Sequence, residues 1–324
     1  MRGMKFIMII NILFLILGFV ILIKGADIFV DGSSSLARNF KLSTMFIGLT
    51  IVSFGTSAPE FAVSIQSLLK GSGDIILGNV LGSNILNILL IIGISSLFHP
   101  LVVKDNTVKK ELPIVLLISS LLIVLITDSL FGLGENSFTR QDGIILLLCF
   151  SVFLYYLIAL MKNGQNNDND EPIKYNKKKS ALFIVLGLLG IILGSNLVVD
   201  SSSKIATALG VSERMIALTI VALGTSLPEL VTSVSATRKG EYDIAIGNVV
   251  GSNIFNIGMV LALPIAIFGG ISNMTFNIID LVAMLFSALL LFLFSIKDRK
   301  IGKLNGMALL AVFIVYYSYV VLAR

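Results

Sequence analysis

Two carboxylates, Glu60 and Glu229, lie within long apolar stretches, and each ends the same short motif, G-T-S-x-P-E. A carboxylate at the centre of a membrane-spanning helix costs about 3 kcal/mol on insertion scales unless it meets a cavity or a partner. No Lys or Arg occurs at the centre of either stretch, or in the apolar stretches that follow at 74–98 and 243–268. The sequence therefore predicts that a bound metal ion or a proton neutralises these two glutamates.

Further oxygen atoms gather around each glutamate at helical spacing. Thr56 precedes Glu60 by four residues and Ser83 precedes Asn87 by four, so each pair shares a helix face. Pro59 removes a helical hydrogen bond and frees a carbonyl in the preceding turn, and freed carbonyls at membrane depth can coordinate cations. All these features recur 169 positions later, without any His or Cys. Such an all-oxygen set suits a hard cation such as Ca2+ better than Zn2+ or Cu+.

The two motifs belong to one internal repeat. Residues 50–88 align with residues 219–257 without a gap, and 22 of the 39 positions are identical. The identities are mostly polar positions and glycines, whereas the apolar positions between them vary. This pattern predicts that two half-molecules build one polar site.

Composition places the chain in a membrane. Of its 324 residues 56% are hydrophobic and 13% are charged, with a mean hydropathy of +0.97, whereas a soluble domain is about 25% charged. Most Lys and Arg fall in short connecting segments, so the basic pI reflects membrane topology and predicts no nucleic-acid partner. The single cysteine, Cys149, excludes an intramolecular disulfide. We predict an all-α integral membrane protein without a prosthetic group.

Apolar runs of about 20 residues predict ten membrane spans, the first retained rather than cleaved as a signal peptide. We place them near 6–31, 43–69, 74–98, 112–133, 142–161, 181–203, 214–237, 243–268, 276–296 and 304–323. The polar segment 162–180 predicts a linker between two five-helix repeats, 1–161 and 181–324. Because five is odd, the second repeat must enter the membrane in the opposite sense, an inverted arrangement typical of secondary transporters.

The connecting segments also predict an orientation. With both termini outside, the inside segments hold 16 Lys and Arg residues and the outside segments hold 7. The positive-inside rule therefore favours a multi-pass plasma-membrane protein with a cytoplasmic linker and both termini outside. We expect a monomer. Asp31 and Asp200 are also repeat equivalents, but they lie near span ends, where a helix cap or a vestibule charge is the expected role.

The two motifs also resemble a known family. G-T-S-x-P-E followed by G-N-x-x-G-S-N-x-x-N, present twice in ten spans, closely resembles the sodium/calcium exchanger group of the cation/calcium antiporters. The resemblance implies exchange of Ca2+ for Na+ by alternating access, with a core made of the second, third, seventh and eighth spans. By motif position it implies a central site of Glu60, Asn87, Glu229 and Asn256, surrounded by the hydroxyls of Thr56, Ser57, Ser83, Thr225, Ser226 and Ser252 and the carbonyls of Ser53 and Ala222.

Three alternatives remain open at this point. Proton coupling would make the protein a Ca2+/H+ antiporter. Some family members, including potassium-dependent ones, carry Asp where this chain has Asn256, so this asparagine argues against potassium co-transport and against proton coupling at that position. An intramembrane peptidase with Ser57 as nucleophile would need a base, and the only histidine, His99, lies outside both copies of the 39-residue repeat at 50–88 and 219–257. A passive calcium channel would carry Ca2+ without a counter-ion on the opposite side.

Overall fold

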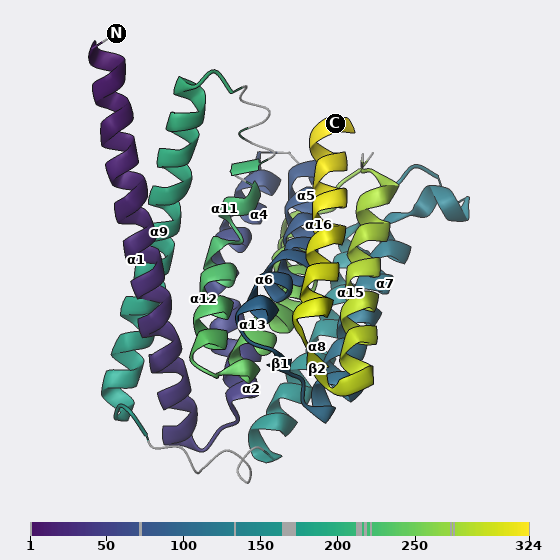
Figure 1. The fold of residues 1–324 in the computed structure, drawn as a ribbon. Coiled ribbons are helices and arrows are strands. Elements are labelled where there is room, and N and C mark those ends of the chain that lie inside the picture. Colours follow the sequence, from purple (N-terminus) through teal and green to yellow (C-terminus); the bar gives the residue numbers. More distant parts are fainter. Residues whose placement is uncertain are drawn as a thin grey trace.

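The computed structural model describes residues 2–70, 73–132, 134–163, 173–211, 216, 219–220, 222–272, 274 and 276–323. It is a bundle of helices in which the two termini lie at one end, and the end of α8 (Arg140–Asn163) and the start of α9 (Lys177–Ala208) lie at the other (Figure 1). We call these the terminal end and the linker end.

The first half of the chain supplies five spans, of which the second is bent and the third contains a π-helical turn. Its helices are α1 (Arg2–Phe40), α2 (Thr44–Ile47), η1 (Gly48–Val52), α3 (Ser53–Thr56), α4 (Ala58–Leu69), α5 (Gly73–Leu86), η2 (Asn87–Ile92), α6 (Gly93–Phe98), η3 (Thr107–Glu111), α7 (Leu112–Ile126), η4 (Asp128–Phe131) and α8 (Arg140–Asn163).

The second half repeats this order. Its helices are α9 (Lys177–Ala208), α11 (Ala222–Gly224), α12 (Leu227–Arg238), α13 (Tyr242–Phe255), η7 (Asn256–Leu261), α14 (Ala262–Phe268), α15 (Ile278–Asp298) and α16 (Lys303–Ala323). Two short strands, β1 (Leu101–Val102) and β2 (Lys300–Ile301), pair antiparallel and join the two halves at the linker end.

Among the described residues, seven helices are long and apolar enough to cross a membrane, or eight if the bent pair 44–56 and 58–69 forms one span. The remaining two predicted spans correspond to η3 with α7, and to α11 with α12, whose preceding residues lie partly outside the described part. The molecule is thus an all-α integral membrane protein of ten spans in two inverted five-helix repeats.

Several span ends differ from the prediction. The fourth span was predicted to reach residue 133, but α7 ends at Ile126, and Asp128 then accepts hydrogen bonds from the backbone and hydroxyl of Ser137. Leu130 and Phe131 extended the apolar run without extending the helix. α1 continues to Phe40 rather than 31. The ends of the predicted linker are helical, because α8 reaches Asn163 and α9 begins at Lys177.

α1 and α9 lie side by side along their length at one edge of the molecule (Figure 1). Glycines allow this close approach. A Cβ atom at Gly187 would lie 2.5 Å from the backbone nitrogen of Phe29, and one at Gly194 would lie 2.5 Å from that of Leu22. In lipid, such van der Waals packing of small residues is a main source of helix association.

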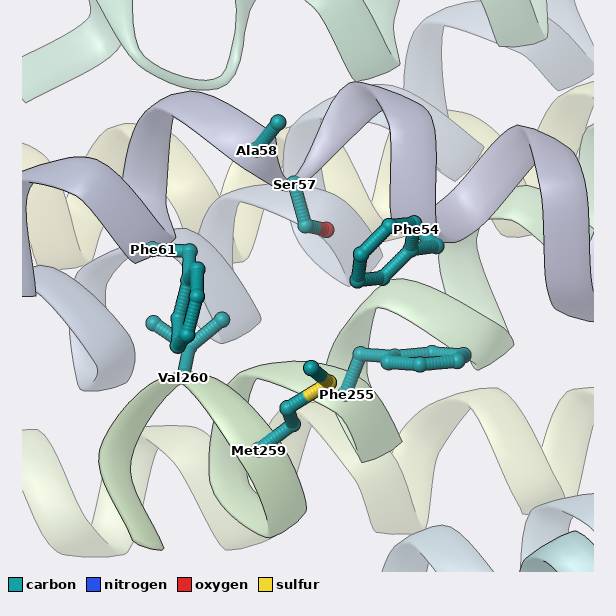
Figure 2. Close-up of a pocket in the computed structure, with 7 residues that line it drawn as sticks. All are labelled: Phe54, Ser57, Ala58, Phe61, Phe255, Met259 and Val260. Atoms are coloured by element: carbon teal, nitrogen blue, oxygen red, sulfur yellow. The ribbon is translucent and has the colours of Figure 1, made fainter. Parts of the chain in front are cut away.

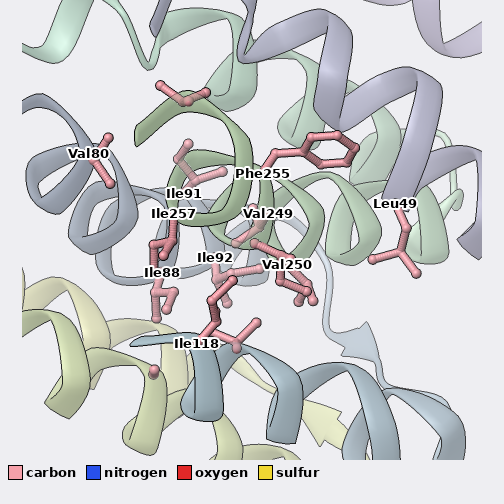
Figure 3. Packing of buried hydrophobic residues seen from close by; sticks show 14 of the residues in the cluster. Leu49, Val80, Ile88, Ile91, Ile92, Ile118, Val249, Val250, Phe255 and Ile257 are labelled. Carbon is pink, nitrogen blue, oxygen red and sulfur yellow. The ribbon is translucent and has the colours of Figure 1, made fainter. Parts of the chain in front are cut away.

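Part of the buried core lies between the third, fourth and eighth spans, where aliphatic side chains interdigitate (Figure 3). Gly247 and Gly251 of α13 bring this core close to η1 and α3, because Cβ atoms there would lie 3.0 Å from Gly48 Cα and 2.6 Å from Ser53 Oγ. These two glycines therefore serve helix packing. Their repeat equivalents, Gly78 and Gly82, have no described atom within 4 Å of a Cβ position.

Candidate ion-binding site

Each glutamate lies in the first turn of a half-helix that begins at a break in its span. In the first repeat, α3 ends at Thr56, the chain turns at Ser57, and α4 begins with Pro59 in its first turn, bent by 45°. The second repeat reproduces the turn at Ser226, where φ is −91° and ψ is 3°. The proline lacks an N–H and fits a helix N-terminus, so the break places both glutamates where two half-helices begin.

The asparagines at the ends of the longer motif lie where the third and eighth spans change their helical winding. The π-helical turn η2 begins at Asn87, and η7 begins at Asn256. Single π turns within α-helices are rare and occur frequently at functional sites. The two halves therefore present these amides from equivalent positions.

The four predicted central residues are fully enclosed by protein. Glu60 and Asn256 are 0% exposed, and Asn87 and Glu229 are 1% exposed. Each of the four has a buried side-chain oxygen that accepts no hydrogen bond from the described residues: Oε2 of each glutamate and Oδ1 of each asparagine. Buried acceptors are nearly always paired, so four unpaired oxygens on four repeat-related residues indicate a site for a positively charged ligand.

The amide groups of these asparagines are oriented by two further asparagines, each from the opposite repeat. Asn87 Nδ2 donates to Asn253 Oδ1 at 2.9 Å, and Asn256 Nδ2 donates to Asn84 Oδ1 at 3.1 Å. Asn84 and Asn253 are themselves fixed, because each Nδ2 donates to the other's backbone carbonyl at 3.3 Å. With their NH2 groups engaged in this way, Asn87 and Asn256 leave their Oδ1 atoms for a ligand.

Asn84 and Asn253 were not among the predicted site residues. Asn is present at this position in both copies of the repeat, which could have marked these residues as site candidates. Their role, however, depends on hydrogen bonds between the two copies, which the spacing of residues along one helix does not predict. Asn79 and Asn248 act similarly on the glutamates, since their Nδ2 atoms donate to the backbone carbonyls of Glu60 and Glu229 at 3.4 and 3.3 Å.

The predicted hydroxyls surround the two carboxylates and cross between repeats. Ser57 Oγ of the first repeat donates to Glu229 Oε1 at 3.1 Å. Ser83 Oγ donates to Glu60 Oε1 at 3.4 Å and accepts from Ser226 Oγ at 3.4 Å. Two of the remaining predicted hydroxyls donate elsewhere in this structure: Thr56 Oγ1 to Asn248 Oδ1 at 3.0 Å, and Ser252 Oγ to the Ser53 carbonyl at 3.4 Å. Thr225 lies beside Glu60.

The predicted carbonyl ligand of Ser53 is already engaged in this structure. It accepts from the backbone of Ser57 at 3.0 Å, from Thr56 Oγ1 at 3.3 Å and from Ser252 Oγ at 3.4 Å. A cation at this oxygen would have to compete with two hydroxyls that can themselves turn to bind it. Ala222, the equivalent position, begins α11 in the second repeat.

No protein cation neutralises the glutamates within the described part of the chain. Ion pairs of the described residues are made instead by other carboxylates, among them Asp27, Asp31, Asp105, Glu241 and Asp243. Nor do three His, Cys, Asp or Glu side chains cluster among the described residues. The site consists of carboxylate, amide and hydroxyl oxygens, the ligand type that hard cations prefer.

A small pocket reaches the helix break from the side of η7. It is lined by Phe54, Ser57, Ala58, Phe61, Phe255, Met259 and Val260. Its walls are aromatic and aliphatic, and the Ser57 hydroxyl points into it (Figure 2). The Ser57 hydroxyl, which contacts Glu229, therefore also borders an apolar-walled space beside the site.

An inverted-repeat membrane protein with a buried, all-oxygen site at two helix breaks has the architecture of a secondary ion transporter. The chain belongs to the sodium/calcium exchanger protein family, whose model matches residues 10–159 and 179–322. It is a cation/Ca2+ antiporter and not an enzyme, which excludes the peptidase alternative.

Individual relatives match nearly the whole chain. The sodium/calcium exchanger MaX1 of Methanosarcina acetivorans is 32% identical over 341 residues, covering 95% of this chain and 97% of MaX1. The inner membrane protein YrbG of Escherichia coli is 36% identical over 314 residues, covering 94% of each. A structure of the sodium-calcium exchanger NCX_Mj, soaked with zero Na+ and Ca2+, superimposes with a TM-score of 0.82 at 34% identity, covering 96% of this chain and 98% of that one.

Proposed function

We propose that this antiporter exchanges Ca2+ for Na+ by alternating access, and that the two ions compete for one central site. The four unpaired buried oxygens of Glu60, Asn87, Glu229 and Asn256 are the observation that carries this proposal. Around them, the proposed ligand set includes Ser53, Thr56, Ser57, Ser83, Ala222, Thr225, Ser226 and Ser252.

Charge balance explains why exchange would be obligatory. With both glutamates ionised the four central residues carry a charge of −2, which one Ca2+ neutralises and several Na+ neutralise or exceed. Without a cation, the two carboxylates repel each other, and for two unit charges at an assumed separation of about 6 Å the repulsion is about 3 kcal/mol at an effective dielectric of 20. The empty site therefore favours a conformation open to water on one side, and an ion must be loaded before the carrier reorients.

Calcium flux in proteoliposomes, driven separately by Na+, K+ and pH gradients, tests the proposal. We expect a Na+ gradient to drive Ca2+ against its own gradient, with K+ ineffective. Flux driven only by a pH gradient would identify a Ca2+/H+ antiporter instead. Flux that needs no counter-ion on the opposite side would indicate a channel.

Asn256→Asp should change the coupling of this antiporter. A third carboxylate makes the net charge of the ion-free site −3 instead of −2. We therefore expect the exchange rate to depend more strongly on protons or potassium, and its response to membrane voltage to shift. Asn106→Asp is the matched control, because it adds the same charge at an exposed position at the linker end. Exchange currents recorded at several pH values measure both effects. Unchanged ion and voltage dependence in Asn256→Asp would contradict the charge-balance account.

Asn253→Ala should weaken calcium binding without removing an ion ligand. It deprives the Asn87 amide of its acceptor and the Asn84 carbonyl of its donor, so Asn87 Oδ1 is no longer held toward the site. Hydrogen bonds of this kind contribute about 1 kcal/mol each, so we expect a rise of about tenfold in the half-saturating Ca2+ concentration. Asn106→Ala serves as control. Wild-type calcium dependence in Asn253→Ala would show that this contact does not position the ligand.

We further propose that the chain is a plasma-membrane protein with both termini outside and a cytoplasmic linker. In support, the end of α8 and the start of α9, which flank the linker, lie at the end of the molecule opposite the termini (Figure 1), and the linker side carries the excess of basic residues. The proposed division is a first repeat at 1–161, a linker at 162–180 and a second repeat at 181–324, in a monomer. An impermeant thiol reagent that labels a cysteine introduced at Asn167 only from outside would reverse the orientation.

A further inference from the structure

Ion pairs tie α1 to the core at the linker end. Asp31 of α1 accepts from Lys239, directly after α12, at 2.9 Å, and from Lys174 at 2.8 Å. One turn earlier, Asp27 accepts from Ser235 Oγ of α12 at 2.6 Å. The Asp31 and Lys239 side chains are 21% and 27% exposed, so this contact is partly withdrawn from water. These contacts hold the linker end of α1 against α12.

The repeat supplies the same two residue types at the opposite end of the molecule. The repeat offset of 169 residues makes Asp200 the equivalent of Asp31, and Lys70 the equivalent of Lys239. The second copy thus has an aspartate where the first has one, and the first has a lysine where the second has one. Asp200 lies in the last third of α9, and Lys70 directly follows α4. Both of these segments end at the terminal end (Figure 1).

Only one of these two equivalent pairs is formed. Asp200 and Lys70 are both exposed, and neither forms an ion pair with another described residue. In a protein built from inverted repeats, the opposite-facing conformation can be reached when the two repeats exchange conformations. A contact between a residue of the first repeat and one of the second is then replaced by the contact between their equivalents.

We propose that Lys70 and Asp200 form an ion pair that closes the terminal end when the Lys239–Asp31 pair at the linker end opens. The two pairs would alternate, each closing one side of the membrane. This inference rests on the alternating access of the proposed function but not on the identity of the transported ions.

The two closures are unequal, because the linker end has an additional ion pair. Arg38 Nη2 lies 2.7 Å from Glu241 Oε1, and both side chains are largely buried at 13% and 14% exposure. The repeat equivalents of these residues are Thr207 and Ser72, which carry no charge. The Arg38–Glu241 ion pair at the linker end therefore has no charged counterpart at the equivalent repeat positions.

Thiol crosslinking tests the predicted contact directly. In a Cys149→Ala background, Lys70→Cys with Asp200→Cys would be treated with a short bifunctional thiol reagent during turnover. A protease site inserted in the linker would then show on a gel whether the two halves are joined. We expect crosslinked halves and loss of exchange. Lys70→Cys with Leu193→Cys, a position of α9 that is 62% exposed, is the control that should stay uncrosslinked.

Charge reversal provides a second measurement that does not depend on the reagent. Lys70→Asp and Asp200→Lys alone place like charges together, so each should change the exchange rate by roughly two- to fivefold, the range of exposed ion pairs. The double reversal should return the rate to within about twofold of wild type. Absence of crosslinking during turnover, or a double variant no better than either single one, would overturn the proposal. Crosslinking on the gel does not depend on whether Na+ or H+ drives exchange. It therefore tests the Lys70–Asp200 contact, whereas the flux assay with separate Na+, K+ and pH gradients tests the proposed coupling.

Discussion

Glu60→Gln and Glu229→Gln should each lower calcium exchange by more than 100-fold while the protein stays folded. Each glutamine removes one of the two charges of the site and directs an amide NH2 group at the cation. The loss of attraction at ligand distance exceeds about 3 kcal/mol even at an effective dielectric of 20, which corresponds to more than 100-fold in binding. Folding should persist, because glutamine has the same shape and can still accept from Ser83 or Ser57.

Proteoliposome flux measures the loss, and the melting temperature and elution volume of the purified protein report folding. Glu135→Gln is the matched control, since Glu135 is exposed in the loop before α8 and should exchange at the wild-type rate. A glutamine variant that transports calcium as fast as the wild type would remove that glutamate from the site.

Gly187→Ala should strongly destabilise the folded protein by forcing two helices apart. Its Cβ atom would lie 2.5 Å from the backbone nitrogen and 2.7 Å from the Cα atom of Phe29, and backbone atoms cannot turn aside as a side chain can. α1 and α9 must therefore separate. Overpacking of this kind costs about 1–3 kcal/mol or more, so we expect the melting temperature to fall by roughly 5 °C or more.

Gly302→Ala is the control for this prediction, because no described atom lies within 4 Å of its Cβ position. Thermal unfolding of both variants in the same detergent makes the comparison. Equal melting temperatures would mean that the two helices can shift apart at no cost, and that their close approach does not stabilise the fold.

Much of the architecture could be predicted because membrane spans and repeats leave strong patterns. Apolar runs gave the number of spans, and an odd number of spans per copy required inversion. The four enclosed oxygens were also predictable in kind, because buried carboxylates without a protein cation need a ligand. The span ends were less predictable: at α7, apolar residues continue past the point where Thr127 and Asp128 turn the chain.

Contacts between the two copies could not be read from the sequence. The position of Asn84 on its helix does not reveal that its side chain accepts a hydrogen bond from Asn256 of the other copy. Nor does the sequence reveal that the Ser57 hydroxyl donates to Glu229 rather than to Glu60. The resemblance implied the Ser53 carbonyl as a ligand, but the backbone N–H of Ser57 and hydroxyls from both copies already donate to it. Such outcomes depend on how the repeats pack against each other.

The crossed contacts of Asn84 and Asn253 also bear on how the two halves of the chain could diverge after a duplication. Copies of a gene usually drift apart, since each can lose what the other retains. Here a substitution at Asn84 alters the surroundings of Asn256 in the other copy, and a substitution at Asn253 does the same to Asn87. Neither copy can therefore change these asparagines without affecting the site residue of the other copy. This accounts for polar positions that are identical in both copies while many apolar residues between them differ.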